Sequence, residues 1–362
     1  MAALLAPLAA AAAPPLAPGT IVVAGFPYTW LPGYMPGPCD DALCAVDPAL
    51  TTVTPISDAI PLEGTIADLA VEGPSSVVVL AYESNEASAL YRVDVATGAV
   101  ATLATGLPLS WNVASARGRL FVNGGADIYE VNRMTGAASV FVPGTWFGVD
   151  AEVGGRSLVT AHEIDCFPIY CNEFVRIDVG SGSATPFDPH FPERVTSIDV
   201  APDGYRFVYA AGGIFGDGLV MRTGPSGAIE ILLGGECSQT TTHGVVSDLD
   251  GNAIVGSDGA EPCPAVELQR IQPGVGVVAS LDTDFGIAAL DVVPRRACSN
   301  GVDDDGDGEV DWDGGGVGAA DPGCGGNPNR NDERAAACGL GGELALLLPA
   351  LAAIRRRGVR RG

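Results

Sequence analysis

A nine-residue phrase, in which apolar and polar positions alternate, recurs six times along the chain. The copies align without a gap and follow one another at intervals of 47, 38, 46, 45 and 49 residues. In order they read LCAVDPALT (from Leu43), LYRVDVATG (Leu90), IYEVNRMTG (Ile128), FVRIDVGSG (Phe174), LVMRTGPSG (Leu219) and LQRIQPGVG (Leu268). Alternation over the first four or five positions of most copies predicts a β-strand with one buried face.

The second half of the phrase predicts a tight hairpin. In three copies a residue suited to starting a turn follows the strand: Asp94, Asn132 and Asp178. Five copies end in glycine, at Gly98, Gly136, Gly182, Gly227 and Gly276, whereas the first ends at Thr51. Glycine supplies the positive φ that such a turn needs. Short apolar segments such as AVATLA and AIEILL follow, so each phrase forms one hairpin with the strand after it.

Two further apolar segments precede each hairpin. The first is a run such as TIADLAV (from Thr65), WNVASA (Trp111), TSIDVAPDG (Thr196) or HGVVSDLDG (His243). The second is SVVVLAY (Ser76), RLFVNG (Arg119), RFVYAAG (Arg206) or NAIVGS (Asn252). Four strands in about 45 residues, repeated, are typical of a β-propeller blade.

The two ends of the repeat region complete one another. The first hairpin has one strand before it, TIVVAG from Thr20, and an unaccompanied segment, FGIAALDVV from Phe285, follows the last. The sequence therefore predicts an all-β fold, a six-bladed β-propeller over residues 19–294 whose first blade is shared by both chain ends. A seven-bladed ring with one degenerate blade and a pair of β-sandwiches are the alternatives.

The repeat resembles the broad group of NHL-like and lactonase-like six-bladed propellers. This resemblance covers the whole repeat region but is architectural, and it includes no motif that identifies a ligand.

Residues 1–18 resemble a secretory signal peptide. They read MAALLAPLAAAAAPPLAP, an apolar, alanine-rich stretch that ends in small residues, although it has no positively charged start. We therefore expect an exported protein. A disordered Ala/Pro leader is the alternative.

Residues 338–362 combine Cys338, glycines, the apolar run Leu344–Ile354 and terminal arginines. This order of elements resembles the C-terminal sorting tails of the myxobacterial (MYXO-CTERM) type. The resemblance implies a C-terminal apolar helix, removal of the tail and retention at the cell surface or outer membrane, with Cys338 as the processing or lipid-attachment point. An ordinary membrane anchor with a spare thiol is the alternative.

The charge of the chain argues against one class of partner. The formal net charge is −25, all 19 basic residues are arginines, and five of them stand in the last eight positions. An acidic body repels phosphate backbones, so we expect no nucleic-acid partner. The acidity serves solubility or the attraction of divalent cations.

The nine cysteines fit an exported, disulfide-containing protein. Close neighbours suggest the pairs 39–44, 166–171, 237–263 and 298–324, although eight cysteines allow 105 pairings. Free buried thiols are the alternative.

An aspartate-rich stalk over residues 295–337 follows the repeats. Asp303, Asp305, Asp307, Gly308 and Asp311 fit the start of an EF-hand-like loop, D-x-D-x-D-G-x-x-D. Glu309 would contribute its backbone carbonyl. Gly314 stands where an EF-hand has its bidentate glutamate, so the loop resembles the thrombospondin type 3 and dockerin class. We expect a structural Ca²⁺ here, held by Asp303, Asp305, Asp307, Glu309 and Asp311. An acidic linker without metal is the alternative.

Candidate ligand-binding residues lie near the starts of the innermost strands. They are Trp111, Asn112, Trp146, Asp150, His162, Glu163, His243 and Asp284, and His190 is the remaining histidine. No catalytic motif accompanies them.

The favoured hypothesis is a non-catalytic surface module that binds a glycan, a protein or the matrix. The alternative is a secreted calcium-dependent lactonase or esterase, with Glu63, Asn112 and Asp199 or Asp248 around a channel metal.

Overall fold

The computed structural model describes the repeat region of the chain. It covers residues 13–293 except 27–38, 41, 59, 61–65, 74, 85, 117, 125, 153–154, 167–168, 188–194, 202–203, 211–218, 225–226, 235–243, 257–266 and 284. Every regular element within this part is a β-strand, and it contains no helix long and apolar enough to span a bilayer. The predicted calcium loop, C-terminal helix and sorting tail lie outside the described residues.

Twenty-four strands form six four-stranded sheets, which we number as blades along the chain. Blade 1 contains β24 (Gly286–Val292), β1 (Ile21–Phe26), β2 (Leu43–Val46) and β3 (Val53–Ser57). Blade 2 contains β4 (Ile66–Gly73), β5 (Ser76–Tyr82), β6 (Ala87–Asp94) and β7 (Val100–Pro108). Blade 3 contains β8 (Asn112–Ala116), β9 (Arg119–Asn123), β10 (Asp127–Val131) and β11 (Ala138–Pro143).

The other three blades repeat this plan. Blade 4 contains β12 (Trp146–Ala151), β13 (Ser157–Cys166), β14 (Ile169–Asp178) and β15 (Ala184–Pro186). Blade 5 contains β16 (Val195–Val200), β17 (Arg206–Ala210), β18 (Leu219–Thr223) and β19 (Ile229–Gly234). Blade 6 contains β20 (Val245–Ser247), β21 (Ala253–Gly256), β22 (Glu267–Gln272) and β23 (Gly276–Asp282).

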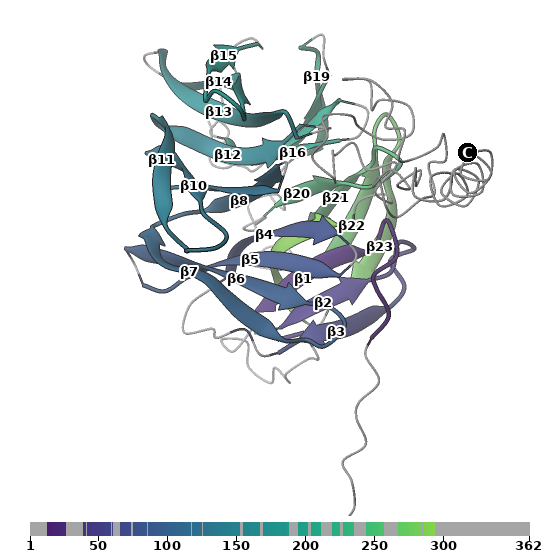
Figure 1. Ribbon diagram of the computed structural model, residues 1–362. Coiled ribbons are helices and arrows are strands. Elements are labelled where there is room, and N and C mark those ends of the chain that lie inside the picture. The colour runs from purple at the N-terminus through teal and green to yellow at the C-terminus, as the bar shows by residue number, and fades with distance from the viewer. Residues whose placement is uncertain are drawn as a thin grey trace, which may run out of the picture. The chain divides into compact units, whose positions relative to one another are not determined.

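The six sheets stand around a common axis, as Figure 1 shows. Their innermost strands contact one another in the order β24, β4, β8, β12, β16, β20 and back to β24. The protein is therefore a six-bladed β-propeller, as the repeat predicted, and neither the seven-bladed ring nor the pair of sandwiches occurs.

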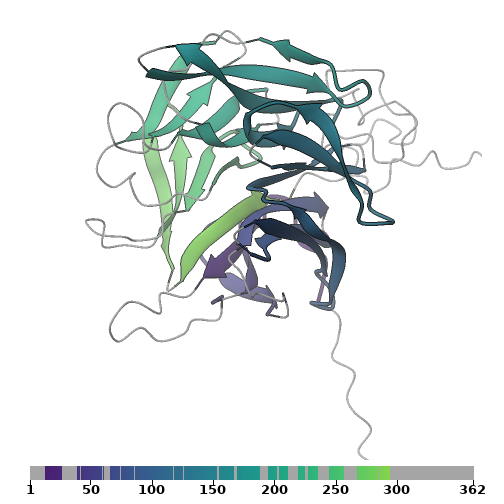
Figure 2. The ribbon, with the colours of Figure 1, turned by 90° about the vertical axis from the view of Figure 1, so that its left-hand side faces the viewer.

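Blade 1 combines strands from both ends of the described chain. β24 pairs antiparallel with β1, with Ile21 opposite Val292 and Val23 opposite Leu290. In Figure 2 the yellow-green β24 runs beside the purple β1. β24 occupies the innermost place of this sheet.

The repeated phrase forms the third strand of each blade and the turn after it. Carboxylate or amide oxygens at its fifth position accept backbone N–H groups inside the turn: Asp94 from Thr97, Asn132 from Thr135, and Asp178 from Ser181, at 2.7–3.0 Å. The terminal glycines have the expected positive φ, for example 67° at Gly98 and 71° at Gly136. In the first copy Leu50 takes this role instead, with φ of 56°.

The hydrophobic core lies between blades. Alternate residues of one strand face opposite neighbours: on β5, Val77 and Val79 pack with blade 1, whereas Val78 and Leu80 pack with blade 3. One such cluster fills the interface between the two blades of each of the six adjacent pairs. Because both faces of a sheet are buried, the second strands read as continuous apolar runs rather than alternating ones.

The predicted disulfide between Cys39 and Cys44 is present, with the two Cα atoms 6.0 Å apart. Cys166 and Cys171 lie on the paired strands β13 and β14 near their connecting turn, but their side chains are not described. The remaining cysteines lie outside the described residues, so their predicted pairing stays a prediction.

Candidate functional site

A small cavity of about 40 Å³ lies in the central channel. All six innermost strands contribute to its wall, which makes it the place where the blades meet. The side chains that carry polar atoms into this lining are Asp68, Asn112, Asp150, Ser197, Asp199 and Asp291.

The four channel aspartates connect four of the six pairs of adjacent blades. The carboxylate of Asp68 accepts a hydrogen bond from the backbone N–H of Val113 on β8 at 2.9 Å. Asp150 accepts from Val200 on β16 at 2.8 Å. The corresponding bonds of the other two run from Val71 on β4 to Asp291 (2.6 Å) and from Ser247 on β20 to Asp199 (2.8 Å). These side chains thus stabilise the ring.

The same carboxylates favour protonation. Each is partly accessible from the channel but otherwise enclosed by protein, and burial disfavours the charged form. Burial raises the pKa of Asp68 to about 8, opposed by the N–H groups of Val113 and Leu69 and assisted by the charges of Asp291 and Asp150. Burial likewise raises the pKa of Asp291 to about 7 and that of Asp150 to about 6.

Asp199 belongs to the same electrostatic group. Burial and then the neighbouring charge of Asp150 raise the pKa of Asp199 well above its usual value, although Ser247 donates hydrogen bonds to it. The channel therefore gathers four acidic side chains, and the described residues of its lining include no basic side chain.

Asn112 differs from these aspartates because its side-chain oxygen has no partner. The residue is 8% exposed, its Oδ1 accepts no hydrogen bond, and it lines the channel cavity. A buried amide oxygen without a partner costs free energy, and none of the described residues offsets this cost at Asn112.

Three residues that the sequence proposed as candidates lie together in the channel: Asn112, Asp150 and Asp199. The sequence reasoning missed Asp68 and Asp291, although each interrupts an apolar run that forms an innermost strand. That interruption was the available signal.

Other candidates lie elsewhere. Trp111 stacks on Phe147, with ring centroids 6.3 Å apart, and buried Trp146 contacts the ring of His162. His162 also faces Glu173 across β13 and β14 at 3.4 Å. Asp248 occupies a turn and forms an ion pair with Arg270 at 2.8 Å, so it does not join Asn112 and Asp199 in the cavity lining.

The remaining predicted site residues are not described. They are Glu63, His190, His243, Asp284, the side chain of Glu163, the loop residues Asp303, Asp305, Asp307, Glu309 and Asp311, and Cys338. Among the residues that are described, no three His, Cys, Asp or Glu side chains lie close enough to hold one metal ion.

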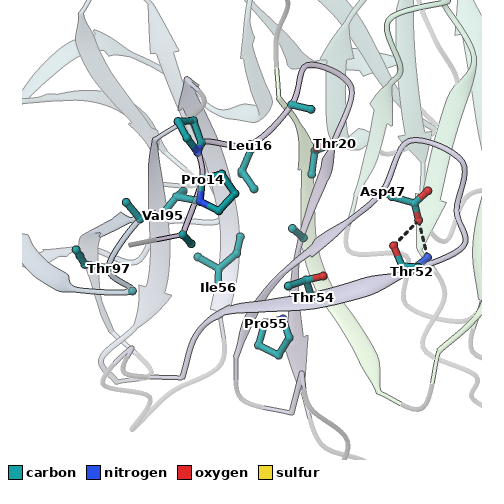
Figure 3. Close-up of a pocket in the computed structure, with 16 residues that line it drawn as sticks. Pro14, Leu16, Thr20, Asp47, Thr52, Thr54, Pro55, Ile56, Val95 and Thr97 are labelled. Atoms are coloured by element: carbon teal, nitrogen blue, oxygen red, sulfur yellow. Dashed lines mark hydrogen bonds between the residues drawn. The ribbon is translucent and has the colours of Figure 1, made fainter. Parts of the chain in front are cut away.

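A second and larger pocket, of about 580 Å³, lies between blades 1 and 2. Residues 13–17 form one wall, β3 forms another, and the turn after β6 forms a third, as Figure 3 shows. Leu16, Ile56 and Val95 are among its apolar residues, and Thr54 and Thr97 add hydroxyl groups.

The wall formed by residues 13–17 is attached to both blades. The N–H of Ala13 donates to the carbonyl oxygen of Ala96 at 2.8 Å, and the N–H of Gly19 donates to that of Val293 at 2.9 Å. Leu16 packs against the core cluster between blades 1 and 2. Part of the segment that resembles a leader is therefore built into the propeller.

Asp47 supplies the ionisable side chain of this pocket's described lining (Figure 3). Slight burial opposes its ionisation, but hydrogen bonds from Thr51 and Thr52 outweigh this effect and lower the pKa of Asp47 to about 2. Asp47 is charged at neutral pH, and its oxygens are occupied by these two threonines.

Comparisons with known proteins identify the fold. No family model matches the sequence, and no curated protein sequence matches it. The structure is similar to TolB from Acinetobacter baumannii, with a TM-score of 0.56 and 14% identity over 76% of this chain and 66% of that chain. The match thus leaves about a third of TolB without a counterpart.

Weaker similarities concern two further proteins. A putative 6-phosphogluconolactonase from Bacteroides fragilis has a TM-score of 0.46 and 10% identity, covering 76% of this chain and 98% of that one. A catalytically inactive virginiamycin B lyase from Staphylococcus aureus, solved with quinupristin, has a TM-score of 0.42 and 12% identity, covering 62% and 71%. The class itself follows from the sheet topology: the chain is a β-propeller with six blades.

Proposed function

We propose that this chain is a non-catalytic binding or structural module, exported and held at the cell surface, with a glycan, a protein or a matrix component as its ligand. The observation that carries the proposal is the side pocket between blades 1 and 2. Its volume of about 580 Å³ lies within the range of small-ligand sites. Because residues 13–17 form one of its walls, the proposal requires that these residues stay in the exported chain. Its apolar walls and threonine hydroxyls suit a ligand with an apolar part and a few polar groups.

The channel carboxylates are consistent with a structural role. Each of the four accepts a backbone N–H from the next blade. In our proposal the shared blade 1 fastens the ring, since β24 and β1 come from opposite ends of the repeat region. The loop of residues 303–311 binds Ca²⁺ and stiffens a stalk, and the tail after Cys338 directs the protein to the surface.

The pocket is tested with a neutral, environment-sensitive dye, Nile red. We expect saturable fluorescence with the unaltered protein and its loss in Ile56→Glu, because a charge in the wall repels an apolar probe. Ile231→Glu is the matched control, since Ile231 is 63% exposed on β19 and does not line the pocket. Thr97→Trp, which fills the pocket without adding charge, should also abolish dye binding and replaces Ile56→Glu in the test if that variant does not fold. Equal dye binding by all four proteins would contradict the proposal.

Surface display is tested separately with Cys338→Ala. We expect the unaltered protein to be sensitive to protease added to intact cells and its tail to be absent by intact-mass analysis. In Cys338→Ala the tail should be retained. An unaltered protein found full-length inside the cell would refute the display proposal and leave the pocket proposal standing.

The alternative, a calcium-dependent lactonase or esterase, is favoured by one observation: Asn112, Asp150 and Asp199 line the same cavity. A panel of lactones and aryl esters, assayed with CaCl₂, distinguishes the two proposals. Turnover that Asp199→Asn abolishes would establish the enzyme. We expect no turnover above that of the same variant.

A further inference from the structure

The channel cavity presents hydrogen-bond acceptors from several directions. Four aspartates and Asn112 belong to its lining, which contains no lysine, arginine or histidine among the described residues. Such a surface is complementary to a group that carries positive charge and several N–H donors. We infer that the channel binds a nitrogen cation of an organic ligand, a primary ammonium or a guanidinium group.

The carboxylates retain capacity for such a ligand. An ionised carboxylate offers about four acceptor sites. Asp68 uses one oxygen for Val113 and the other for Leu69, and Asp291 uses its two oxygens for Val71 and Val292. About two acceptor sites per carboxylate therefore stay free for a donor in the channel.

Asn112 gives independent support. Its Oδ1 is buried without a partner, and the residue belongs to the cavity lining. An amide oxygen accepts hydrogen bonds and cannot donate one, so a ligand group that bonds to it must be a hydrogen-bond donor. Burial, assisted by neighbouring carboxylates, raises the pKa values of Asp68 and Asp291, and a bound cation would favour their ionised forms.

An organic cation and a bare metal ion need their acceptors at different distances. A Ca²⁺ ion needs its oxygens at about 2.3–2.6 Å, whereas N–H donors reach acceptors at about 2.7–3.2 Å from nitrogen. Guanidinium distributes five donors over three nitrogens, which spreads the acceptors further apart. Among the described residues no three His, Cys, Asp or Glu side chains form a group that could hold one metal ion, and we therefore infer a nitrogen cation rather than a metal ion.

The size of the cavity limits how much of the ligand enters. About 40 Å³ corresponds to roughly three water-sized positions. That space holds an ammonium with a water molecule or a guanidinium head, while the rest of the ligand extends along the channel. The cation comes either from a small amine or from a basic side chain of a partner protein.

The test is calorimetric titration near pH 8 at low salt, where the carboxylates are more fully ionised and screening is weak. The probes are butylguanidine and butylamine as free cations, butanol as their neutral control, and acetyl-Gly-Arg-Gly-amide with its Gln counterpart as models of a partner's side chain. We expect both free cations and the arginine peptide to bind, and butanol and the glutamine peptide not to bind.

Variants locate the site. In Asp150→Asn/Asp291→Asn we expect at least about tenfold weaker binding, because two charges are lost while the amide oxygens still accept the N–H groups of Val200 and Val71. Asp282→Asn, which removes a charge from exposed β23, is the matched control and should bind within about twofold of the unaltered protein. Asp199→Asn is a single-site substitute if the double variant fails to fold.

The outcomes are distinct. Binding of the arginine peptide at least about tenfold tighter than butylguanidine would assign the cation to a partner's side chain, and equal affinities would assign it to a small amine. Absence of binding by every cationic probe would overturn the inference. So would binding that the channel variants leave unchanged, or CaCl₂ binding that depends on Asp150 and Asp291 and displaces butylguanidine. The CaCl₂ titration is carried out on proteins that also carry Asp303→Asn/Asp305→Asn, so that Ca²⁺ binding to the predicted loop does not contribute to the signal.

Discussion

The carboxylate of Asp291 on β24 accepts a hydrogen bond of 2.6 Å from the backbone N–H of Val71 on β4, 220 positions away in the sequence. This bond joins the last strand of the propeller to blade 2. Asp68, Asp150 and Asp199 form the same kind of bond from their own blades to the next. A buried acceptor thus secures four of the junctions between innermost strands, and the acidity of these groups affects stability.

We predict that the propeller becomes less stable as pH rises. Carboxyls whose pKa is raised on folding hold protons that the unfolded chain releases near pH 4, so their contribution is complete below that value and is lost as pH rises through the folded-state values. These are about 6 for Asp150, 7 for Asp291 and 8 for Asp68. Calorimetry should therefore give a lower Tm at about pH 8.5 than at about pH 5.5.

The matched variants assign this pH effect. Asp68→Asn cannot ionise, so its Tm should fall less over the same pH interval. Asp282→Asn should follow the unaltered protein, since Asp282 is exposed. A Tm that rises with pH, or an equal fall in Asp68→Asn and the unaltered protein, would show that Asp68 is not protonated at neutral pH.

Gly136→Ala should destabilise the propeller more than Gly118→Ala. Both glycines have positive φ, 71° and 70°, but a Cβ at Gly136 would lie 2.6 Å from the carbonyl oxygen of Leu103, whereas Gly118 has nothing within 4 Å. Backbone strain alone costs about 1–2 kcal/mol, and moving the Leu103 carbonyl adds about 1–3 kcal/mol. Urea unfolding measures both, and equal losses would mean that the turn of blade 3 does not press on blade 2.

Removal of the Cys39–Cys44 disulfide should lower stability modestly. The sequence separation of the two cysteines is 5, and closing so short a loop accounts for about 2 kcal/mol. The variant Cys39→Ser/Cys44→Ser should show this loss by urea unfolding. Mass analysis after alkylation without reduction should find no label on either cysteine of the unaltered protein, and a label there would contradict the disulfide.

The aspartate loop should bind Ca²⁺. Terbium luminescence, excited through a nearby aromatic side chain and displaced by CaCl₂, should report one site that Asp305→Asn/Asp307→Asn abolishes, because two of its carboxylates are lost. Asp58→Asn, a change at an exposed position of blade 1, should leave the signal intact. Luminescence that survives the double substitution would place the ion elsewhere.

The blades were predictable because their signal is local. Asp94 and Gly98 fix one turn within five residues, and the same arrangement recurs at Asn132 and Gly136. The first copy departs from the rule because Leu50 adopts positive φ beside Thr51, stabilised by hydrogen bonds to Asp47, and nothing in the glycine pattern indicates this.

The sites were only partly predictable because they depend on contacts between distant segments. Asn112, Asp150 and Asp199 were recognisable as polar residues in innermost strands, but their meeting with Asp68 and Asp291 follows from ring geometry. The side pocket needs residues 13–17 to cross from blade 2 to blade 1, and no periodicity within that Ala/Pro segment specifies its path.

The two ends of the propeller meet directly, since Gly19 donates to Val293 and Val293 donates to Thr20, at 2.9 and 2.8 Å. A short linker could join them, and the chain could then be opened at an exposed turn such as that of Gly274, where nothing lies within 4 Å of an added Cβ. We therefore expect the architecture to tolerate circular permutation, because blade 1 already combines strands from two distant parts of the chain.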